Sequence, residues 1–460
     1  MERERYFNAV EFKDIKGIIY NSAKQYAKNT AFILKHKEDK KVTYENITYK
    51  KLLQDINAFG TQLYEMGLKD KRIAIVGRNR YEWVITHLSN LLGGIVSIPL
   101  DKELQVDELE SCLERSKADV VVFDEKYTEN IEEIKKRQNT KLQTYICMTE
   151  KEGYQNFWDL KAQGEKLIKQ GKKEYTKVKI DENKMGILLF TSGTTSKSKV
   201  VALSHKNMVS NVMDFASVLD IDSSDRILSF LPLHHVFECT VGMLYSLYIG
   251  AQRSFCEGIR HIVENLNEYQ ITFASFVPAI YESMHKTIIK NLEKEGKLEA
   301  VRKLMEANKD KTMAEKKEIF KDIHNVFGGQ IKLFVSGAAA LEKEVEEDFR
   351  AWGVNLCQGY GLTETSPVIG VETNENFRVG SIGKPLPHIQ AKIEDANEEG
   401  MGELVVKGPN VMLGYYNDEE ATKEVLEDGW FRTGDLAKID EDGYIFICGR
   451  KKSVIVLKNG

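Results

Sequence analysis

Hydrophobic residues recur along the first part of the chain at two different spacings, and each spacing predicts one kind of element. Apolar residues three to four positions apart over residues 49–65 and 81–92 predict helices with a buried face. Short and almost wholly apolar runs at residues 72–76 and 120–123 predict buried strands. Strands that alternate with helices of this length indicate a parallel sheet with helices on its faces.

The same alternation continues through the middle of the chain. Strands are expected at residues 271–277 and 331–335, and helices at residues 205–219 and 344–352. Residues 287–324 are highly charged, with Leu, Ile and Met at helical intervals. Because Glu and Asp balance the lysines there, we expect a solvated helical hairpin rather than a lysine-rich element on a membrane surface.

Residues 227–251 form one apolar segment that is long enough to raise the question of a membrane span. Pro232, His234, His235 and Glu238 gather in its first half, where lipid would tolerate them poorly. A buried strand, a turn and a buried helix are therefore expected.

The pattern changes again after Gly380. Helical periodicity disappears, and short strands at residues 390–393 and 402–407 alternate with polar turns, as in an antiparallel sheet. The chain is therefore predicted to be an α/β protein. We expect two α/β subdomains with mainly parallel sheets flanked by helices over about residues 40–379, and a smaller antiparallel β subdomain over about residues 380–449.

Composition narrows the class of protein without changing this picture. The 460 residues are 42% hydrophobic and 29% charged, as in ordinary globular proteins. A net charge of -5 gives no basic field, so nucleic acid is not expected as the partner. The six cysteines have no CxxC pair, which disfavours a zinc site or a disulfide framework and favours a cytoplasmic location. The charged N-terminus shows no signal peptide.

A loop rich in hydroxyls and lysines follows an apolar run at residues 187–190 and precedes another at residues 200–203. Gly193 allows backbone N–H groups to converge, and this combination suits a polyphosphate. A polar hairpin turn on the surface is the alternative, which the density of hydroxyls and lysines weakens. The polar members are Thr191, Ser192, Thr194, Thr195, Ser196, Lys197, Ser198 and Lys199.

The Walker phosphate loop is a testable rival, because it requires Gly, four residues, and then Gly-Lys-Ser/Thr at the start of a helix. Counted from Gly193, Ser198 replaces the second Gly, and Val200 replaces the Ser or Thr that would hold Mg²⁺. The Walker interpretation therefore fails at two positions.

Two more predicted strands end in small or polar residues. Residues 336–340, Ser-Gly-Ala-Ala-Ala, would let a planar ring lie against the backbone, although tight helix–strand packing explains them equally well. Ligands of open α/β sheets lie beyond the carboxyl ends of strands, so these loops are expected to line one crevice. The second loop offers a stacking ring between two glycines and hard oxygen ligands suited to Mg²⁺ beside phosphates; its residues are Gly359, Tyr360, Gly361, Thr363 and Glu364.

Six motifs occur in the order typical of one family, and together they resemble the adenylate-forming superfamily of acyl-CoA synthetases, non-ribosomal peptide adenylation domains and firefly luciferase. The motif LPLHHVFE, NRYEW at 79–83 and the charged stretch at 287–324 are most similar to long-chain fatty acyl-CoA synthetases. The six motifs are LLFTSGTTSKSKVVALSH (188–205), LPLHHVFE (231–238), VSGAAAL (335–341), QGYGLTETSPV (358–368), GELVVKGPNVMLGYYN (402–417) and GWFRTGDLAKIDEDGYIFICGRKK (429–452).

The resemblance implies a role for each matching residue. The loop from Thr191 through Ser192, Gly193, Thr194 and Thr195 to Lys199 would wrap the ATP β- and γ-phosphates. Tyr360, between Gly359 and Gly361, would stack on adenine beside Gly337 and Ala338. Thr363 would contact the α-phosphate, and Glu364 would bind Mg²⁺. Asp435 and Arg450 would hold the ribose, His235 would lie at the acyl–pantetheine junction, and Lys452 would lie at a hinge between domains.

The implied reaction is ATP-dependent activation of a fatty acid to an acyl-adenylate, followed by thioester formation with CoA. ATP, Mg²⁺, CoA and a fatty acid are the implied ligands, and peripheral association with the inner face of a membrane fits such a substrate. Two alternatives stay open: a ligase for another carboxylic acid, and a catalytically weak fragment that binds acyl groups or nucleotide.

Two departures from the family pattern bear on activity. The family loop usually reads TSGTTGxPKG, whereas Ser196, Ser198 and Val200 stand here in place of Gly, Pro and Gly, so backbone freedom is reduced if those positions need a positive φ. Residues 1–449 correspond to the large N-terminal AMP-binding domain, and residues 450–460 to the hinge and the start of a small C-terminal domain. That domain carries the family's adenylation lysine, so we expect this chain to be impaired.

Overall fold

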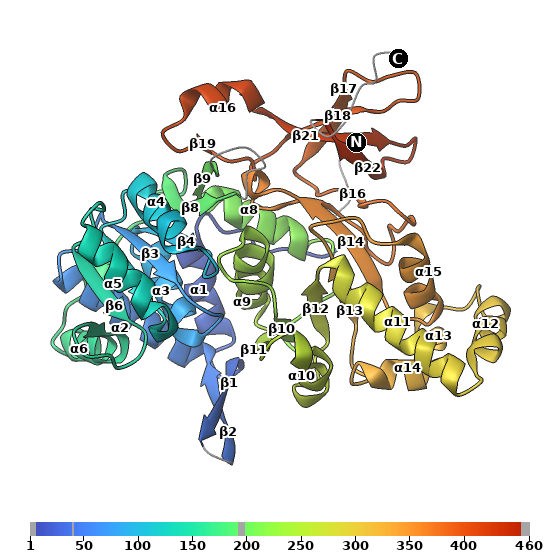
Figure 1. The fold of residues 1–460 in the computed structure, drawn as a ribbon, viewed down its shortest axis with the longest axis horizontal. Helices are drawn as coiled ribbons and strands as arrows, with labels where there is room; N and C mark the ends of the chain where they lie inside the picture. The colour runs from blue at the N-terminus through green and yellow to red at the C-terminus, as the bar shows by residue number, and fades with distance from the viewer. Residues whose placement is uncertain (1–5, 39–40, 192–197, 452–460) are drawn as a thin grey trace.

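The computed structural model describes residues 6–38, 41–191 and 198–451. Among these residues the strands form three sheets (Figure 1). Two large sheets with helices make up the body of the molecule, and a small sheet, red in Figure 1, lies at one end of it. The α/β architecture expected from the sequence is therefore confirmed.

The first large sheet belongs to the N-terminal half of the chain, and its central strands are parallel, as the alternating pattern predicts. The hairpin of β8 and β9 adds an antiparallel edge, which β19 from much later in the chain extends. In spatial order, the described strands of this sheet are β19 (Gly414–Tyr415), β9 (Val200–Ser204), β8 (Met185–Phe190), β4 (Val96–Leu100), β3 (Arg72–Val76), β5 (Val120–Phe123), β6 (Thr144–Cys147) and β7 (Gln155–Asn156).

The second large sheet is parallel at its centre and antiparallel at both edges. Its described strands, in spatial order, are β16 (Lys384–Pro385), β15 (Val368–Val371), β14 (Leu356–Gly361), β13 (Leu333–Ser336), β12 (Phe273–Phe276), β10 (Arg226–Ser229), β11 (Gln252–Phe255), β1 (Thr30–Glu38) and β2 (Lys41–Thr48).

The third sheet is wholly antiparallel in its described part, as the loss of helical periodicity predicts. Its strands are β17 (Gln390–Glu394), β18 (Gly402–Lys407), β21 (Trp430–Ile439), β20 (Leu426–Glu427) and β22 (Ile445–Arg450).

Helices cover both faces of the two large sheets, so their strands read as apolar runs. The described α-helices are α1 (Ile15–Gln25), α2 (Tyr49–Glu65), α3 (Tyr81–Leu92), α4 (Val106–Ser116), α5 (Thr128–Arg137), α6 (Phe157–Lys169), α7 (Glu174–Lys177), α8 (His205–Ala216), α9 (Ser246–Ile249), α10 (Ile262–Glu268), α11 (Pro278–Lys294), α12 (Leu298–Ala307), α13 (Met313–Ile319), α14 (Lys321–Val326), α15 (Lys343–Ala351) and α16 (Glu419–Val425). Three short 3-10 helices are also described, η1 (Glu125–Tyr127), η3 (Ile259–His261) and η4 (Thr363–Thr365), and η2 (Glu238–Tyr245) is a π-helix.

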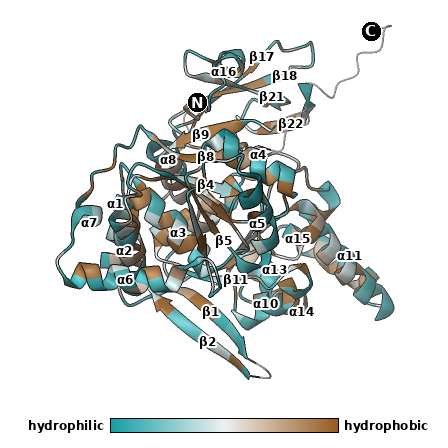
Figure 2. Ribbon diagram, turned by 60° about the vertical axis from the view of Figure 1, so that its left-hand side comes forward, coloured by the Kyte–Doolittle hydropathy of each residue, from teal (hydrophilic) through white to brown (hydrophobic). Residues whose placement is uncertain are grey.

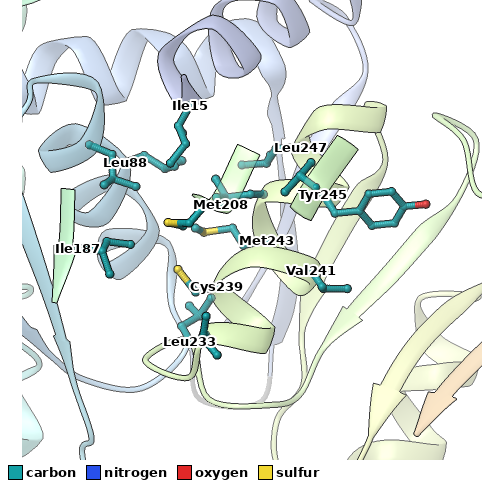
Figure 3. Packing of buried hydrophobic residues seen from close by; sticks show 14 of the residues in the cluster. Ile15, Leu88, Ile187, Met208, Leu233, Cys239, Val241, Met243, Tyr245 and Leu247 are labelled. Carbon is teal, nitrogen blue, oxygen red and sulfur yellow. The ribbon is translucent and has the colours of Figure 1, made fainter. Parts of the chain in front are cut away.

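The largest hydrophobic cluster fills the space between the two large sheets. Helix α3 lies there with all of its residues buried, and Figure 2 shows the apolar strands beside it in brown. Met208 of α8, Met243 of η2 and Leu88 of α3 point toward one another in Figure 3. The apolar strand faces turned away from this core pack on α4 and α5 in the first sheet, and on α10, α11, α14 and α15 in the second.

The predicted element boundaries agree closely with the structure in the first half of the chain, where α2, α3, β3 and β5 match the expected ranges. Differences arise where local pattern is weak. Strands β6 and β7 lie in a Lys- and Glu-rich region in which no strand was expected. The buried helix after β10 begins as a π-helix, η2. Residues 287–324 form four helical pieces rather than one hairpin, because the chain also turns at residues 295–297.

Within the described residues, no helix is long and apolar enough to cross a membrane. The segment at residues 227–251 instead contributes β10, η2 and α9 to the core.

A buried carboxylate joins three helices of the first subdomain and generates a test of this packing. Asp55 of α2 is 1% exposed; its Oδ1 accepts from Lys161 Nζ of α6 at 2.9 Å, and its Oδ2 accepts from Tyr81 Oη of α3 at 3.0 Å. Asp55→Ala removes the buried partner of Lys161, which keeps only the half-exposed Glu165 at 2.9 Å, so the free energy of unfolding should fall by about 1.5–3 kcal/mol. Urea denaturation measures the change.

Tyr81→Phe is the matched control, because it removes only one neutral donor and should cost about 1 kcal/mol. Equal losses for the two variants would contradict the assignment of Asp55 as the charge that holds α6 on α2.

Candidate active site

Several of the predicted site residues, among them Gly337, Tyr360 and Glu364, lie at or just after the ends of β13 and β14 of the second sheet, beneath the small antiparallel sheet. The loops after these strands approach each other closely: a Cβ added to Gly337 would lie 3.4 Å from the carbonyl oxygen of Gly359. Ala338 follows with a φ of 73° and is exposed. The two strand exits are therefore adjacent, and backbone and small side chains face each other there.

The chain leaves β14 through a tight turn that leaves no room for a side chain at one position. A Cβ at Gly361 would lie 1.9 Å from the carbonyl oxygen of Pro367, whereas one at Gly359 would make only ordinary contacts at 3.6 Å and beyond. The two glycines that flank Tyr360 thus differ: close approach of backbone requires Gly361 only.

Tyr360 connects the end of β14 to the small sheet. Its hydroxyl donates a short hydrogen bond to Asp435 Oδ2 of β21. Asp435 is 4% exposed, and its Oδ1 lies 3.1 Å from Nε of Arg450, which is paired with it in register on β22. Burial and the Asp435 carboxylate together raise the pKa of the Tyr360 phenol well above its ordinary value. Three predicted residues therefore form one connected group.

Glu364 forms a second group with Tyr415 of the first sheet and with Met412, just before that strand. Its Oε1 accepts from Tyr415 Oη of β19 at 2.9 Å, and its carbonyl oxygen accepts from the backbone N–H of Met412 at 2.8 Å. The Lys199 Nζ lies 4.3 Å from the centre of the Tyr415 ring. Burial, reinforced by Glu364, raises the pKa of Tyr415. The structure thus brings Lys199, from the predicted phosphate loop, near Glu364, with Tyr415 between them.

The predicted phosphate loop joins β8 to β9, and its two described ends are held together. The N–H of Thr191 donates to the carbonyl oxygen of Lys199 at 3.0 Å. Nη1 of Arg115 on α4 donates to Ser198 Oγ at 3.1 Å, and Nη2 donates to the Ser198 carbonyl. Ser192, Gly193, Thr194 and Thr195 lie outside the described residues.

Two of the three departures from the family loop cause no backbone strain. Ser198 and Val200 both lie in the described part of the chain, and neither has a positive φ. Val200 is the first residue of β9 and pairs with Phe190 across the hairpin. Glycine is therefore not required at position 200. The third departure, Ser196, lies outside the described residues.

His235 lies apart from these groups, in the turn between β10 and the π-helix η2. It is exposed, and its ring centre lies 6.3 Å from that of His234. Burial lowers the pKa of His234 to about 4, although Asp101 opposes this shift. A buried ion pair begins η2, with Glu238 Oε1 2.5 Å from Arg253 Nη2. Lys452 lies outside the described residues.

The donor set around Glu364 fits a magnesium ion that is shared with a polyphosphate. Glu364 and the hydroxyl-bearing Thr363 are adjacent in η4 and are both half-buried. The part of the chain that the structure describes contains no cluster of three or more His, Cys, Asp or Glu side chains able to hold a metal. One carboxylate beside substrate phosphates is an arrangement that proteins use for Mg²⁺.

Tyr415 and Arg115 are the two contributors that sequence reasoning missed. Tyr415 was inside a quoted motif, GELVVKGPNVMLGYYN, but nothing in the local pattern shows that it pairs with β9 and meets Glu364. Arg115 lies in a helix 83 residues before Ser198 and carries no motif. Both residues are placed at the candidate site only by contacts with residues distant in the sequence.

The glycines of β14 generate a test of the site's backbone geometry. Gly361→Ala should destabilise the protein by about 1–3 kcal/mol or more, because its Cβ would overlap the Pro367 carbonyl. Gly359→Ala is the matched control and should stay within about 1 kcal/mol of the parent. Urea denaturation gives both values, and the reverse order would contradict the turn described here.

Comparison with known proteins identifies what this arrangement is similar to. Residues 19–416 match the sequence profile of the family described as AMP-binding enzyme. Fatty acyl-CoA synthetase A of Dictyostelium discoideum is 30% identical over 92% of this chain and 67% of its own length. Long-chain-fatty-acid–CoA ligase 1 of Cavia porcellus is 29% identical over 91% of this chain and 64% of its own length. The chain thus spans about two thirds of the length of these relatives.

Solved structures share the fold. The inhibitor-bound N-terminal domain of FACL13 from Mycobacterium tuberculosis has a TM-score of 0.76 and 21% identity, with 95% of this chain and 100% of that chain covered. ATP-bound MatB from Rhodopseudomonas palustris has a TM-score of 0.75 and 24% identity, with 97% and 80% covered. At these identities the likeness concerns the fold alone.

Proposed function

Because this chain belongs to the family of AMP-binding enzymes, we propose that it activates a fatty acid to an acyl-adenylate, releases pyrophosphate, and transfers the acyl group to CoA. The observation that carries the proposal is a pair of residue groups at and just after the carboxyl end of β14: Tyr360 with Asp435 and Arg450, and Glu364 with Tyr415 and Lys199. The similarity to long-chain fatty acid–CoA ligases supports the choice of acid.

The first group is proposed to bind the nucleoside. The ring of Tyr360 provides a face for adenine, and the small residues Gly337 and Ala338 leave the opposite wall open. The carboxylate of Asp435 can accept hydrogen bonds from ribose hydroxyls while the guanidinium of Arg450 fixes its orientation. The buried position of Asp435 supports this role, because a buried carboxylate strengthens such bonds.

The second group is proposed to bind the phosphates. Lys199 and the hydroxyls of Thr191, Ser192, Thr194 and Thr195, with the backbone at Gly193, would surround the β- and γ-phosphates, and Thr363 would donate to the α-phosphate. Glu364 would hold Mg²⁺, which when bound neutralises the charge on the transferring phosphate oxygens. Tyr415 orients the Glu364 carboxylate by donating to Oε1.

The proposed chemistry follows from where these groups lie. The substrate carboxylate oxygen attacks the α-phosphorus, an O–P bond forms, and the bond to the bridging oxygen of pyrophosphate breaks. The residues of the site mainly position the reactants and offset the charge that develops, as in other phosphoryl transfers. In the second step the CoA sulfur attacks the acyl carbon, the thiol proton is released, and AMP leaves.

The remaining assignments are parts of the same proposal. His235, exposed at the start of the segment that precedes η2, would lie at the acyl–pantetheine junction, and Lys452 at the hinge that follows β22. A cytoplasmic location is supported by the six cysteines, which are all free. Peripheral contact with the inner face of a membrane would suit an acid that partitions into lipid.

Binding of ATP in the presence of Mg²⁺ tests the proposal. Calorimetric titration of the chain with ATP and MgCl₂ should show one site. Glu364→Gln should weaken the affinity about 10- to 100-fold, because it removes the charge proposed to hold the metal. Glu398→Gln, which changes an exposed carboxylate in a turn, is the control and should leave the affinity unchanged.

Palmitate should then bind to the ATP-loaded chain, while benzoate should not. Absence of ATP binding by the unmodified chain would contradict the proposal as a whole. Preference for benzoate would be consistent with adenylating activity but would contradict the assignment of a fatty acid as the substrate.

A further inference from the structure

Two carboxylates are buried behind the end of β14, outside the groups described above. Glu346 of α15 and Glu372, just after β15, are both 0% exposed. Buried carboxylates are rare unless they are paired with a cation or hold the surrounding structure. Neither forms an ion pair in the described part of the chain, so their role is inferred from their hydrogen bonds.

Glu346 holds the side chain of Gln358. Its Oε2 accepts from Gln358 Nε2 at 3.0 Å and from the backbone N–H of Gly380 at 3.0 Å. The other end of the same amide, Gln358 Oε1, accepts from the backbone N–H of Leu341 at 3.2 Å. Gln358 thus connects α15 to the loop at residues 337–341, and it is the second residue before Tyr360.

Glu372 holds the backbone of the same strand. Its Oε2 accepts from the N–H of Gln358 at 2.9 Å, and its own N–H donates to the Gln358 carbonyl at 2.9 Å. Its Oε1 accepts from Ser381 Oγ at 3.1 Å and from the N–H of Arg378 at 3.2 Å. Together the two carboxylates fix Gln358 at both its backbone and its side chain.

The pair is arranged to share one proton. Glu346 Oε1 is buried without a donor among the described residues. Burial and the neighbouring Glu346 raise the pKa of Glu372 to about 9, so a single proton between the two acids is retained at neutral pH. Two ionised carboxylates at this position would repel each other without solvent to screen them.

Other ionisable groups nearby do not supply that proton or a partner cation. Burial raises the pKa of the Cys357 thiol on β14 to about 12. Arg350 of α15 lies 3.5 Å from the Phe377 ring, and the Arg378 side chain pairs with Asp440 and Asp442. Lys343 of α15 lies near Gly380, and Lys384 of β16 faces the Tyr444 ring at 5.0 Å.

We propose that Glu346 is a positioning residue for the nucleotide base: through Gln358 it fixes the loop at residues 337–341 against the end of β14, and so sets the distance between Tyr360 and the wall that faces it. The inference rests on the proposed function, which places adenine between these two segments. Glu346 acts through Gln358 and does not itself contact the nucleotide.

A conservative variant separates this role from simple structural support. In Glu346→Gln the amide oxygen can accept from Gln358 and Gly380, and the amide nitrogen can donate to Glu372, so every hydrogen bond survives without the shared proton. Glu346→Leu removes the acceptor and leaves buried donors on Gln358 and Gly380 unsatisfied. Glu347→Leu, at an exposed position on the same helix, is the control.

The dissociation constant for ATP with MgCl₂ is measured by calorimetry at pH 7.5 and pH 9.5. At pH 7.5, Glu346→Leu should weaken binding about tenfold, because lost buried hydrogen bonds are worth about 1–3 kcal/mol. Glu346→Gln should stay within about twofold of the parent, and Glu347→Leu should not differ from it.

Between pH 7.5 and 9.5 the parent should lose affinity as Glu372 ionises, and Glu346→Gln should lose less. Folding raises the pKa of Glu372, so the folded state holds the extra proton and stability should also fall as pH rises toward about 9, more steeply in the parent than in Glu346→Gln. An unchanged dissociation constant in folded Glu346→Leu, or identical pH profiles for the parent and Glu346→Gln, would overturn the inference. If the parent itself does not bind ATP, the proposed function fails instead.

Discussion

The hydrogen bond from Tyr360 to Asp435, continued by the ion pair with Arg450, is the contact on which the geometry of the site depends. It joins the carboxyl end of a strand in a large parallel sheet to the small antiparallel sheet. Without it, the Tyr360 ring would be held only by its place near the end of β14, between two glycines. With it, the ring is held at its hydroxyl end, which would preorganise it for the proposed stacking on a nucleotide base.

Residues around this contact are also held in position by neighbouring elements. Gly361 brings the backbone after Tyr360 against Pro367. Tyr415 holds Glu364 from the first sheet, and Glu346 holds Gln358 from α15. Tyr360 and Glu364, both proposed to meet the nucleotide, are therefore each held by a residue from another sheet. The proposed site lies where three sheets meet, because Tyr360, Tyr415 and Asp435 come from the second, first and third sheets.

Much of this fold could be predicted from the sequence, because the patterns that predict it lie within short continuous segments. The spacing of apolar residues predicted β3, α3 and β5 with their observed bounds, because a buried strand or helix carries its apolar pattern in its own sequence. The six motifs placed Tyr360, Glu364, Asp435 and Lys199 in one family, and the family assignment is confirmed. Their roles toward a nucleotide stay predictions.

What the sequence could not predict is set by contacts between distant segments. Tyr415 meets Glu364 across 51 positions, and Arg115 meets Ser198 across 83. No local pattern marks Glu346, which reads as one acid among several on a charged helix, yet it is fully buried. The π-helix after β10 follows from tertiary packing in a segment whose apolar residues suit any buried helix.

The most direct measurement of the central claim is a crystal structure of the chain grown with AMP and palmitate. The account predicts that the adenine ring lies on the face of Tyr360, that the ribose hydroxyls reach Asp435, and that the phosphate lies beside Thr363. A nucleotide bound elsewhere, with Tyr360 and Asp435 in their present contact and no ligand beside them, would contradict it.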